Sequence, residues 1–251
     1  MCGSKLFFAP YNSSAVLVMD SITEDVHLVE TGIQGDSKWR GVAASGSKLA
    51  FAPWNSSAVL IMDASSEEIH VVETHVSGEE RYWGVAACGS KFIFSPNDAP
   101  AILIMDANTE EFHFVEPGVQ GKRGKWSGVA ACGTKLAFAA RHASAVLIMD
   151  AVSEECRLVE VGDAMGKYWD VSVVGSRFCF APCDHSSILF IDADTEACEY
   201  VETMLGIQDK YWGVATCGLK VVFSPHNADQ VMIFDDLKLG LRELGMALPS
   251  G

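Results

Sequence analysis

One short segment recurs six times along the chain at nearly constant spacing. It reads Lys-Leu-Phe-Phe-Ala-Pro from Lys5, and its later copies begin at Lys48, Lys91, Lys135, Arg177 and Lys220. Successive copies are 43, 43, 44, 42 and 43 residues apart. A period of this size means that one structural unit is used repeatedly. The chain must therefore fold into six similar units.

Each copy contains four short apolar runs separated by turn-forming residues. In the third copy these runs are residues 83–87, 91–95, 101–105 and 111–115. Phe, Val and Ile are frequent in the runs, and no stretch carries the 3.6-residue period of an amphipathic helix. Four strands per repeat of this length are typical of one blade of a β-propeller. The sequence thus predicts an all-β, single-domain, six-bladed propeller with four antiparallel strands per blade, rather than a sandwich or a β-solenoid.

The phase of the repeat predicts how the ring closes. The opening Met1-Cys-Gly-Ser-Lys matches residues 87–91, where an inner strand ends, so the first blade lacks its inner strand. Residues 245–249 have a similar pattern of Gly, an apolar residue and Ala. We therefore expect the C-terminal strand to join the N-terminal blade and remove the free strand edges. The blades are expected at residues 5–30 with 245–251, 39–73, 83–116, 126–160, 169–202 and 212–244.

The order of motifs resembles a known group of repeats. Gly-Val-Ala, a Gly turn, a basic residue and an apolar strand are followed by Asn and Val-Leu-Ile-Met-Asp, which resembles the YVTN and NHL propeller repeats. The resemblance covers nearly the whole chain. It implies a propeller that binds proteins, as most members of these groups do. It also implies an alternative, because a few related six-bladed rings are metal-dependent lactonases or hydrolases.

Charge and composition argue against several classes of function. The chain carries 33 acidic and 18 basic residues, a net charge of -15, whereas nucleic acids and anionic membranes need clustered Lys and Arg. No apolar run is long enough to span a bilayer, and no secretory signal opens the chain, so a cytoplasmic location is expected. The eight cysteines form no CxxC pair and are expected as buried thiols. No spacing indicates a catalytic triad or a cofactor loop, so neither catalytic residues nor a cofactor is predicted.

The predicted blades sort polar residues onto two faces. An Asp ends the third strand of every copy, and we expect its carboxylate to accept hydrogen bonds from the backbone of its own turn. His27, His70 and His113 lie in outer strands and are expected as solvated spacers. The six aspartates are Asp20, Asp63, Asp106, Asp150, Asp192 and Asp235.

The opposite face carries a loop, between the second and third strands, that differs from copy to copy. Positions that hold a fold together should repeat, whereas recognition positions can diverge, so these loops are the candidate binding surface for a protein or small ligand. The alternative is that their Asn and Asp side chains cap turns. The candidate residues are Tyr11, Asn12, Trp54, Asn55, Asn97, Asp98, Arg141, His142, Asp184, His226 and Asn227, with Cys183 before Asp184.

Five tryptophans are predicted to open the inner strands on this face, each shortly after a basic residue. Either each indole packs between blades while the cation pairs with the Glu that ends the fourth strand, or the pair forms an interface anchor. Asp170 stands where other inner strands have Gly, and burial there would raise its pKa, which makes it a further candidate ligand or acid-base group. The tryptophans are Trp39, Trp83, Trp126, Trp169 and Trp212, and the cations are Lys38, Arg81, Lys125, Lys167 and Lys210.

Three hypotheses follow. The favoured one is a non-enzymatic binding or scaffold module without a bound metal, presenting the variable face to a partner. The alternative is a metal-dependent lactonase or esterase-type hydrolase that holds an ion at Asp98, His142, Asp184 and Asn227. The third is that the chain forms part of a larger assembly.

Overall fold

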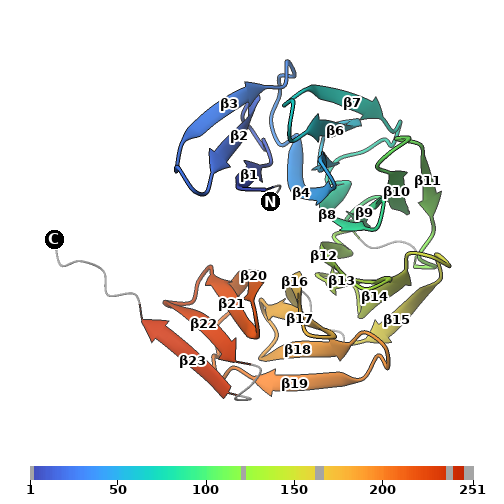
Figure 1. The fold of residues 1–251 in the computed structure, drawn as a ribbon. Helices are drawn as coiled ribbons and strands as arrows, with labels where there is room; N and C mark the ends of the chain where they lie inside the picture. Colours follow the sequence, from blue (N-terminus) through green and yellow to red (C-terminus); the bar gives the residue numbers. More distant parts are fainter. Residues whose placement is uncertain (1–2, 120–122, 162–166, 236–239, 246–251) are drawn as a thin grey trace. The chain divides into compact units, whose positions relative to one another are not determined.

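All regular elements of the chain are β-strands (Figure 1). The computed structural model describes residues 3–119, 123–161, 167–235 and 240–245, the last of these by their backbone. The strands form six antiparallel sheets, which confirms the all-β prediction. The chain divides into two compact units, residues 1–123 and 124–251, each considered by itself below. Among the described residues, no helix has the length and apolar character needed to cross a membrane.

The first unit contains three sheets, in which strand order follows chain order. The first sheet has three strands, β1 (Lys5–Phe8), β2 (Ala15–Asp20) and β3 (Val26–Glu30). The second has β4 (Trp39–Ser45), β5 (Lys48–Pro53), β6 (Ala58–Asp63) and β7 (Ile69–Glu73). The third has β8 (Tyr82–Cys88), β9 (Lys91–Pro96), β10 (Ile102–Asp106) and β11 (Phe112–Val115).

The second unit contains three four-stranded sheets with the same strand order. The fourth sheet has β12 (Trp126–Cys132), β13 (Lys135–Ala140), β14 (Ala145–Asp150) and β15 (Cys156–Glu160). The fifth has β16 (Tyr168–Val174), β17 (Arg177–Pro182), β18 (Ser187–Asp192) and β19 (Cys198–Glu202). The sixth has β20 (Tyr211–Cys217), β21 (Lys220–Pro225), β22 (Gln230–Asp235) and β23 (Gly240–Gly245).

Consecutive sheets within a unit pack face to face through alternating residues. Side chains on a strand point to opposite faces in turn, so each sheet has one face toward the next sheet and one toward the preceding sheet. Phe7, Val16 and Val18 of the first sheet pack in one cluster with Phe51 and Leu60 of the second. We call the face toward the next sheet, here that of Phe7, Val16 and Val18, the leading face. The face toward the preceding sheet, here that of Phe51 and Leu60, is the trailing face. The second and third sheets pack in the same way, as do the fifth and sixth.

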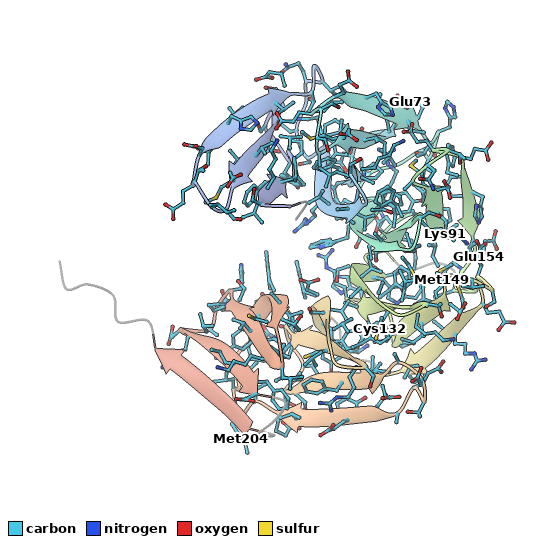
Figure 2. The ribbon with its side chains drawn as sticks, in the orientation of Figure 1. Glu73, Lys91, Cys132, Met149, Glu154 and Met204 are labelled. Carbon is cyan, nitrogen blue, oxygen red and sulfur yellow. The ribbon has the colours of Figure 1, made fainter. Side chains whose placement is uncertain are left out.

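Burial of single side chains follows from this stacking. Met149 of β14 is fully buried, whereas Met204, on the connector after β19, points into solvent (Figure 2). At the inner strands the sheets approach closely, because a Cβ on Gly41 would lie 3.0 Å from the Cα of Gly84. Only a residue without a side chain fits there, which explains the small residues of the inner strands.

The predicted ring closure depends on residues that are mostly outside the described part of the chain. Gly245 belongs to β23, the outer strand of the sixth sheet, where it pairs with Gln230 of β22. Its assignment to the first blade is therefore wrong, and residues 246–251 lie outside the described residues. The first sheet has three strands among the described residues. Closure of the ring stays a prediction.

Five of the six aspartates that end the third strands cap their turns as predicted, and the turn after Asp235 lies outside the described residues. Asp63 Oδ1 accepts the backbone N–H groups of Ser65 and Ser66 at 2.8 and 3.0 Å, and Oδ2 accepts the Ser47 hydroxyl at 2.7 Å. The Ser47 hydroxyl and the two N–H groups lower the pKa of Asp63 to about 2. Equivalent bonds form at Asp20, Asp106, Asp150 and Asp192.

The outer-strand histidines are exposed, as predicted, and two of them also contact a glutamate of the neighbouring sheet. His27 Nε2 lies 2.9 Å from Glu67 Oε2, and Lys5 Nζ donates to Glu67 Oε1 at 2.6 Å. His70 makes the same contact with the next turn glutamate, Glu110, at 2.7 Å. The sequence missed these pairs because they join residues 40 positions apart in neighbouring sheets.

The buried-thiol prediction holds for some cysteines only. Cys179 and Cys183 are buried, whereas Cys198 and Cys217 are exposed. Both exposed thiols lie at strand ends, where side chains leave the packed interior. The prediction is wrong at these two positions.

Candidate functional site

The tryptophans of the inner strands fall into two structural classes. Trp39 and Trp126 begin β4 and β12, are fully buried, and donate their indole N–H to the carbonyls of Ala58 and Ala145 at 2.9 and 3.0 Å. The strands β8, β16 and β20 begin with tyrosine at that position. The other three tryptophans therefore come one residue later and point to the other side of their strands. They are Trp83, Trp169 and Trp212, and the prediction that all five are equivalent is wrong.

In the first unit, side chains at the second position of the inner strands contact side chains of the variable loops. The Arg40 guanidinium carbon lies 3.3 Å from the centre of the Trp83 ring, 5.2 Å from that of Trp54 and 5.8 Å from that of Tyr11. Trp54 and Trp83 pack edge to face at 5.2 Å. Three aromatic rings thus converge on one cation. We call Tyr11, Arg40, Trp54 and Trp83 the first aromatic cluster.

A comparable arrangement occurs in the second unit. Trp169 and Trp212 stack in parallel with ring centres 4.2 Å apart, and Trp212 stacks on His226 at 3.6 Å. The Arg141 guanidinium lies 4.5 Å from the centre of the Trp169 ring, at the other end of the stack. We call Arg141, Trp169, Trp212 and His226 the second aromatic cluster. Tyr11, Trp54, Arg141 and His226 were among the predicted site residues, and the structure brings them into these two clusters.

The Asn and Asp side chains of the variable loops hold the neighbouring connectors. Asn55 Oδ1 accepts the backbone N–H of Glu80 at 2.8 Å. Asn12 and Asp184 make the equivalent bonds to the N–H groups of Ser37 and Asp209, each at 2.8 Å. The donors lie 25 residues further along the chain. These side chains therefore cap a neighbouring segment rather than their own turn.

The remaining predicted loop residues have contacts of their own. Asn97 is buried and its Nδ2 donates to the Glu80 carbonyl at 2.9 Å. Asn227 Nδ2 donates to the Gln208 carbonyl at 3.3 Å. Asp98 lies 3.8 Å from Arg123, and the ring of His142 fills the space that a Cβ on Gly124 would occupy.

Four of the five basic residues before the inner strands donate to backbone carbonyls. Lys38 Nζ donates to the Gly35 carbonyl at 2.5 Å, Lys167 to the Ala143 carbonyl at 2.7 Å and Lys210 to the Ile207 carbonyl at 3.0 Å. Arg81 donates to the carbonyls of Val76 and Ser56. All four cations are buried. Carbonyl groups of irregular segments need donors when buried, and long basic side chains supply them.

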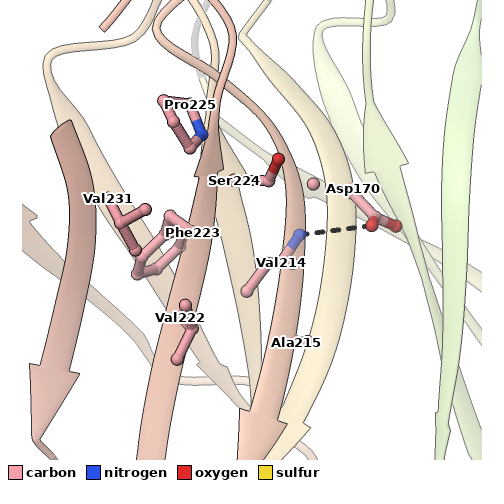
Figure 3. Close-up of a pocket in the computed structure, with 9 residues that line it drawn as sticks. Asp170, Val214, Ala215, Val222, Phe223, Ser224, Pro225 and Val231 are labelled. Carbon is pink, nitrogen blue, oxygen red and sulfur yellow. Dashed lines mark hydrogen bonds between the residues drawn. The ribbon is translucent and has the colours of Figure 1, made fainter. Parts of the chain in front are cut away.

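Asp170 lies beside a hollow on the sixth sheet (Figure 3). Its Oδ2 accepts the backbone N–H of Val214 at 3.3 Å, and its Oδ1 that of Val171 at 2.9 Å. Burial raises the pKa of this carboxyl to about 6, and the two N–H donors partly oppose that rise. The hollow measures about 460 Å³ and is lined mainly by apolar groups, among them Val222 and Val231.

The metal site proposed from the sequence is not assembled within either unit. Asp98 belongs to the first unit, whereas His142, Asp184 and Asn227 belong to the second. Among the described residues, the donor atoms close enough to share one ion are those of Cys183, Asp184 and Asp209. There, Cys183 Sγ donates to Asp209 Oδ1 at 3.2 Å, and burial together with the nearby carboxylates raises the pKa of the thiol.

Solved structures of other proteins share the arrangement of strands. The Cps50 (Swd1) β-propeller domain of Myceliophteria thermophila matches with a TM-score of 0.70 over 98% of this chain and 84% of that domain, at 17% sequence identity. The fold is that of a β-propeller. Virginiamycin B lyase of Staphylococcus aureus matches this propeller with a TM-score of 0.81 over 99% of this chain and 83% of the lyase, at 10% identity.

A nidogen/laminin complex matches the propeller as well, with a TM-score of 0.66 over 97% of this chain and 94% of the other, at 11% identity. At such identities the likeness shows the fold alone. No protein-family model matches the chain, and neither does any curated protein. The propeller with its six repeated blades is therefore established, while its function has to be argued from its own residues.

Proposed function

We propose that this propeller is a non-enzymatic binding module that engages a protein or small-ligand partner through its two aromatic clusters. The observation that carries the proposal is the pairing of variable loop residues with variable inner-strand residues. In the first unit, Arg40 of an inner strand contacts Trp54 of a variable loop and Trp83 of the next inner strand. In the second unit, Trp212 of an inner strand stacks on His226 of a variable loop. The rest of the repeat is nearly copied from blade to blade.

The chemistry of the clusters suits recognition. Aromatic and arginine side chains supply most of the energy at the centres of protein interfaces, because they bury large areas at a small cost in conformational entropy. Tyr11 is 38% exposed and His226 is also exposed, so both clusters have a member that a partner can reach. The stacked rings are held by one another, which reduces the freedom lost on binding.

The experiment compares capture by the wild type with capture by a Tyr11→Ala, His226→Ala double variant. Immobilised protein is exposed to lysate and metabolite extract, and retained molecules are quantified by mass spectrometry. A partner retained by the wild type should be reduced about tenfold or more, corresponding to about 1.4 kcal/mol of lost binding free energy. Circular dichroism verifies that the double variant is folded.

The matched control is Val152→Ala, which trims an exposed apolar side chain in a turn at the other end of a sheet. This variant should retain the partner at the wild-type level. Equal retention by all three proteins would contradict the proposal. The proposal would also be contradicted if the wild type retains only the molecules that a protein-free resin retains.

A further inference from the structure

The outer strand of the fifth sheet, β19, has one open edge (Figure 1). It pairs with β18 on one side, and no other described strand pairs with it. An unpaired edge offers its backbone N–H and C=O groups to a further strand. The inner strand β16 of this sheet contacts β12 and β20, the inner strands of its two neighbours in the second unit. The open edge is therefore a feature of the second unit alone.

Glu199 carries the opposite charge to the residues at its position in the other outer strands. It pairs with Phe190 across β18 and β19, and its side chain is 52% exposed. Arg177 of the same sheet donates to one of its carboxylate oxygens at 2.7 Å. The strand β19 is thus acidic at a position that is His or Arg in the other five outer strands. The residues at the equivalent position are His27, His70, His113, Arg157 and Arg242.

Two further side chains of β19 lie on its trailing face. Tyr200 is 45% exposed, and its ring centre lies 5.9 Å from that of His185. Glu202 is exposed as well, and its Oε1 accepts the Ser187 hydroxyl at 2.7 Å. These contacts hold both side chains, which reduces the conformational freedom lost when a partner binds.

Met204 lies two residues beyond β19 and is 91% exposed (Figure 2). Its φ of 58° is left-handed, a conformation that costs energy for a residue with a side chain. The Thr203 hydroxyl donates to the Ser186 carbonyl at 2.6 Å, and Leu205 packs against the core, so the backbone on both sides is held. A strained residue that exposes a large apolar side chain indicates an interaction site. The equivalent residues of three other connectors, also left-handed, are Gly32, His75 and Gly118.

We propose that β19 is a docking edge for a basic, extended segment of a partner protein, which pairs with it as a fifth strand of the sheet. Directly opposite residues of paired strands have Cβ atoms about 5 Å apart. A Lys or Arg of the partner at that distance reaches Glu199 on the leading face, while an apolar residue contacts Tyr200 on the trailing face. The partner continues past the end of β19 and covers Met204.

Charge determines the kind of partner. The chain carries a net charge of -15, and Glu199 stands where the other outer strands have a basic residue, so a basic segment is attracted to this edge in particular. The docking edge shares no residue with the two aromatic clusters. It is therefore a second interaction surface, beyond the proposed function.

The experiment measures the fluorescence anisotropy of a labelled peptide, Phe-Gly-Lys-Val-Leu-Lys-Val, at low ionic strength. When it pairs antiparallel with β19, its lysines lie opposite Glu199 and Glu202, its leucine opposite Tyr200 and its phenylalanine beside Met204. The wild type should bind this peptide saturably. Glu199→Lys should weaken binding by about tenfold or more, because it places like charges opposite each other.

Two further variants refine the test. Glu199→Gln keeps an acceptor for Arg177 and should weaken binding by less than Glu199→Lys, and it replaces that variant if Glu199→Lys fails to fold. Met204→Gly suits the left-handed backbone, so it should fold like the wild type and weaken binding by about threefold. Circular dichroism verifies that each variant is folded.

The matched control is Glu68→Lys, which makes the same charge change at an exposed residue of the second sheet. It should bind the peptide like the wild type. A second peptide, with proline in place of leucine, keeps both lysines but lacks a backbone N–H in the middle of the strand. This peptide should bind the wild type about tenfold more weakly.

Absence of saturable binding to the wild type would overturn the proposal. Equal affinity of the wild type and Glu199→Lys would do the same. Equal affinity for the two peptides would also overturn it, because attraction between charges alone does not require strand pairing. None of these outcomes bears on partner capture by the aromatic clusters, because the variants alter neither cluster.

Discussion

The side-chain oxygen of Asn55 accepts the backbone N–H of Glu80 at 2.8 Å. Glu80 has a positive φ of 52°, a conformation that costs energy for a residue with a side chain. Ser37 and Asp209, which bond to Asn12 and Asp184, have φ values of 54° and 51°. In three blades, one loop side chain thus fixes a left-handed residue just before the next inner strand.

Removing this acceptor should destabilise the propeller. Asn55→Ala removes the acceptor of the exposed Glu80 N–H, and we expect a loss of about 0.5 to 1.5 kcal/mol in the free energy of unfolding. Asn55→Asp keeps an acceptor oxygen and should lose less. Urea denaturation followed by circular dichroism measures both. Equal stability of Asn55→Ala and the wild type would show that the bond contributes nothing.

The Asp-capped turns contain a second left-handed position that glycine should improve. Glu24 and Glu67 adopt φ values of 62° and 60°. Glu24→Gly should raise the free energy of unfolding by about 0.5 to 1 kcal/mol, because relief of the strained φ exceeds the entropy cost of glycine. Glu67→Gly should gain less, since it also removes the contacts with Lys5 and His27. Thermal unfolding of both variants provides the comparison, and a larger gain at Glu67 would contradict this account.

Asp170 should make stability depend on pH between about 4 and 6. The pKa of its carboxyl rises from 3.8 to about 6 on folding, so in this window the folded state binds more protons than the unfolded state. Stability contributed by the protonated form is therefore lost as pH rises through the window, by up to about 3 kcal/mol. Asp170→Asn should be less stable than or equal to the wild type at pH 4 and more stable at pH 7. Denaturation curves at both values test this, and an unchanged difference would exclude the titration.

The stack of Trp169 on Trp212 predicts a spectroscopic signature. Parallel indoles 4.2 Å apart couple their electronic transitions and should give a paired band in far-ultraviolet circular dichroism. Trp212→Phe should abolish this band. Trp83→Phe changes a tryptophan of the first unit and should leave the band in place. Persistence of the band in Trp212→Phe would disprove the stacking.

The repeat was enough to predict the strands and their turns. Alternation of apolar residues and the fixed position of Asp63 and its equivalents are local properties, and β-strands and Asx-type caps depend on local sequence. The six repeated sheets are present, and Gly245 lies in β23 rather than in the first sheet. The error at Gly245 arose because the pattern of an inner strand and that of an outer strand are similar over so few residues.

The candidate site could be predicted only in part. Tyr11, Trp54, Arg141 and His226 could be named as candidates from the sequence because their positions vary within a copied loop. Arg40 was not among the candidates, because aligning the tryptophans with one another matched Arg40 with glycine and serine. This alignment is one residue out of register, since the structural equivalent of Arg40 is Trp83. A register error of one residue changes the side of the strand from which a side chain points. Internal comparison at the observed strand starts would have revealed it.

The sequence by itself determined that the chain forms six repeated blades, since the period and the strand pattern are one-dimensional properties. Only the tertiary structure decided which side chains meet. Lys38 bonds to a backbone carbonyl instead of Glu30, and His27 contacts Glu67 of the next sheet. These pairings depend on how neighbouring sheets are placed against each other. That placement follows from side-chain packing between residues far apart in the sequence, which no local pattern encodes.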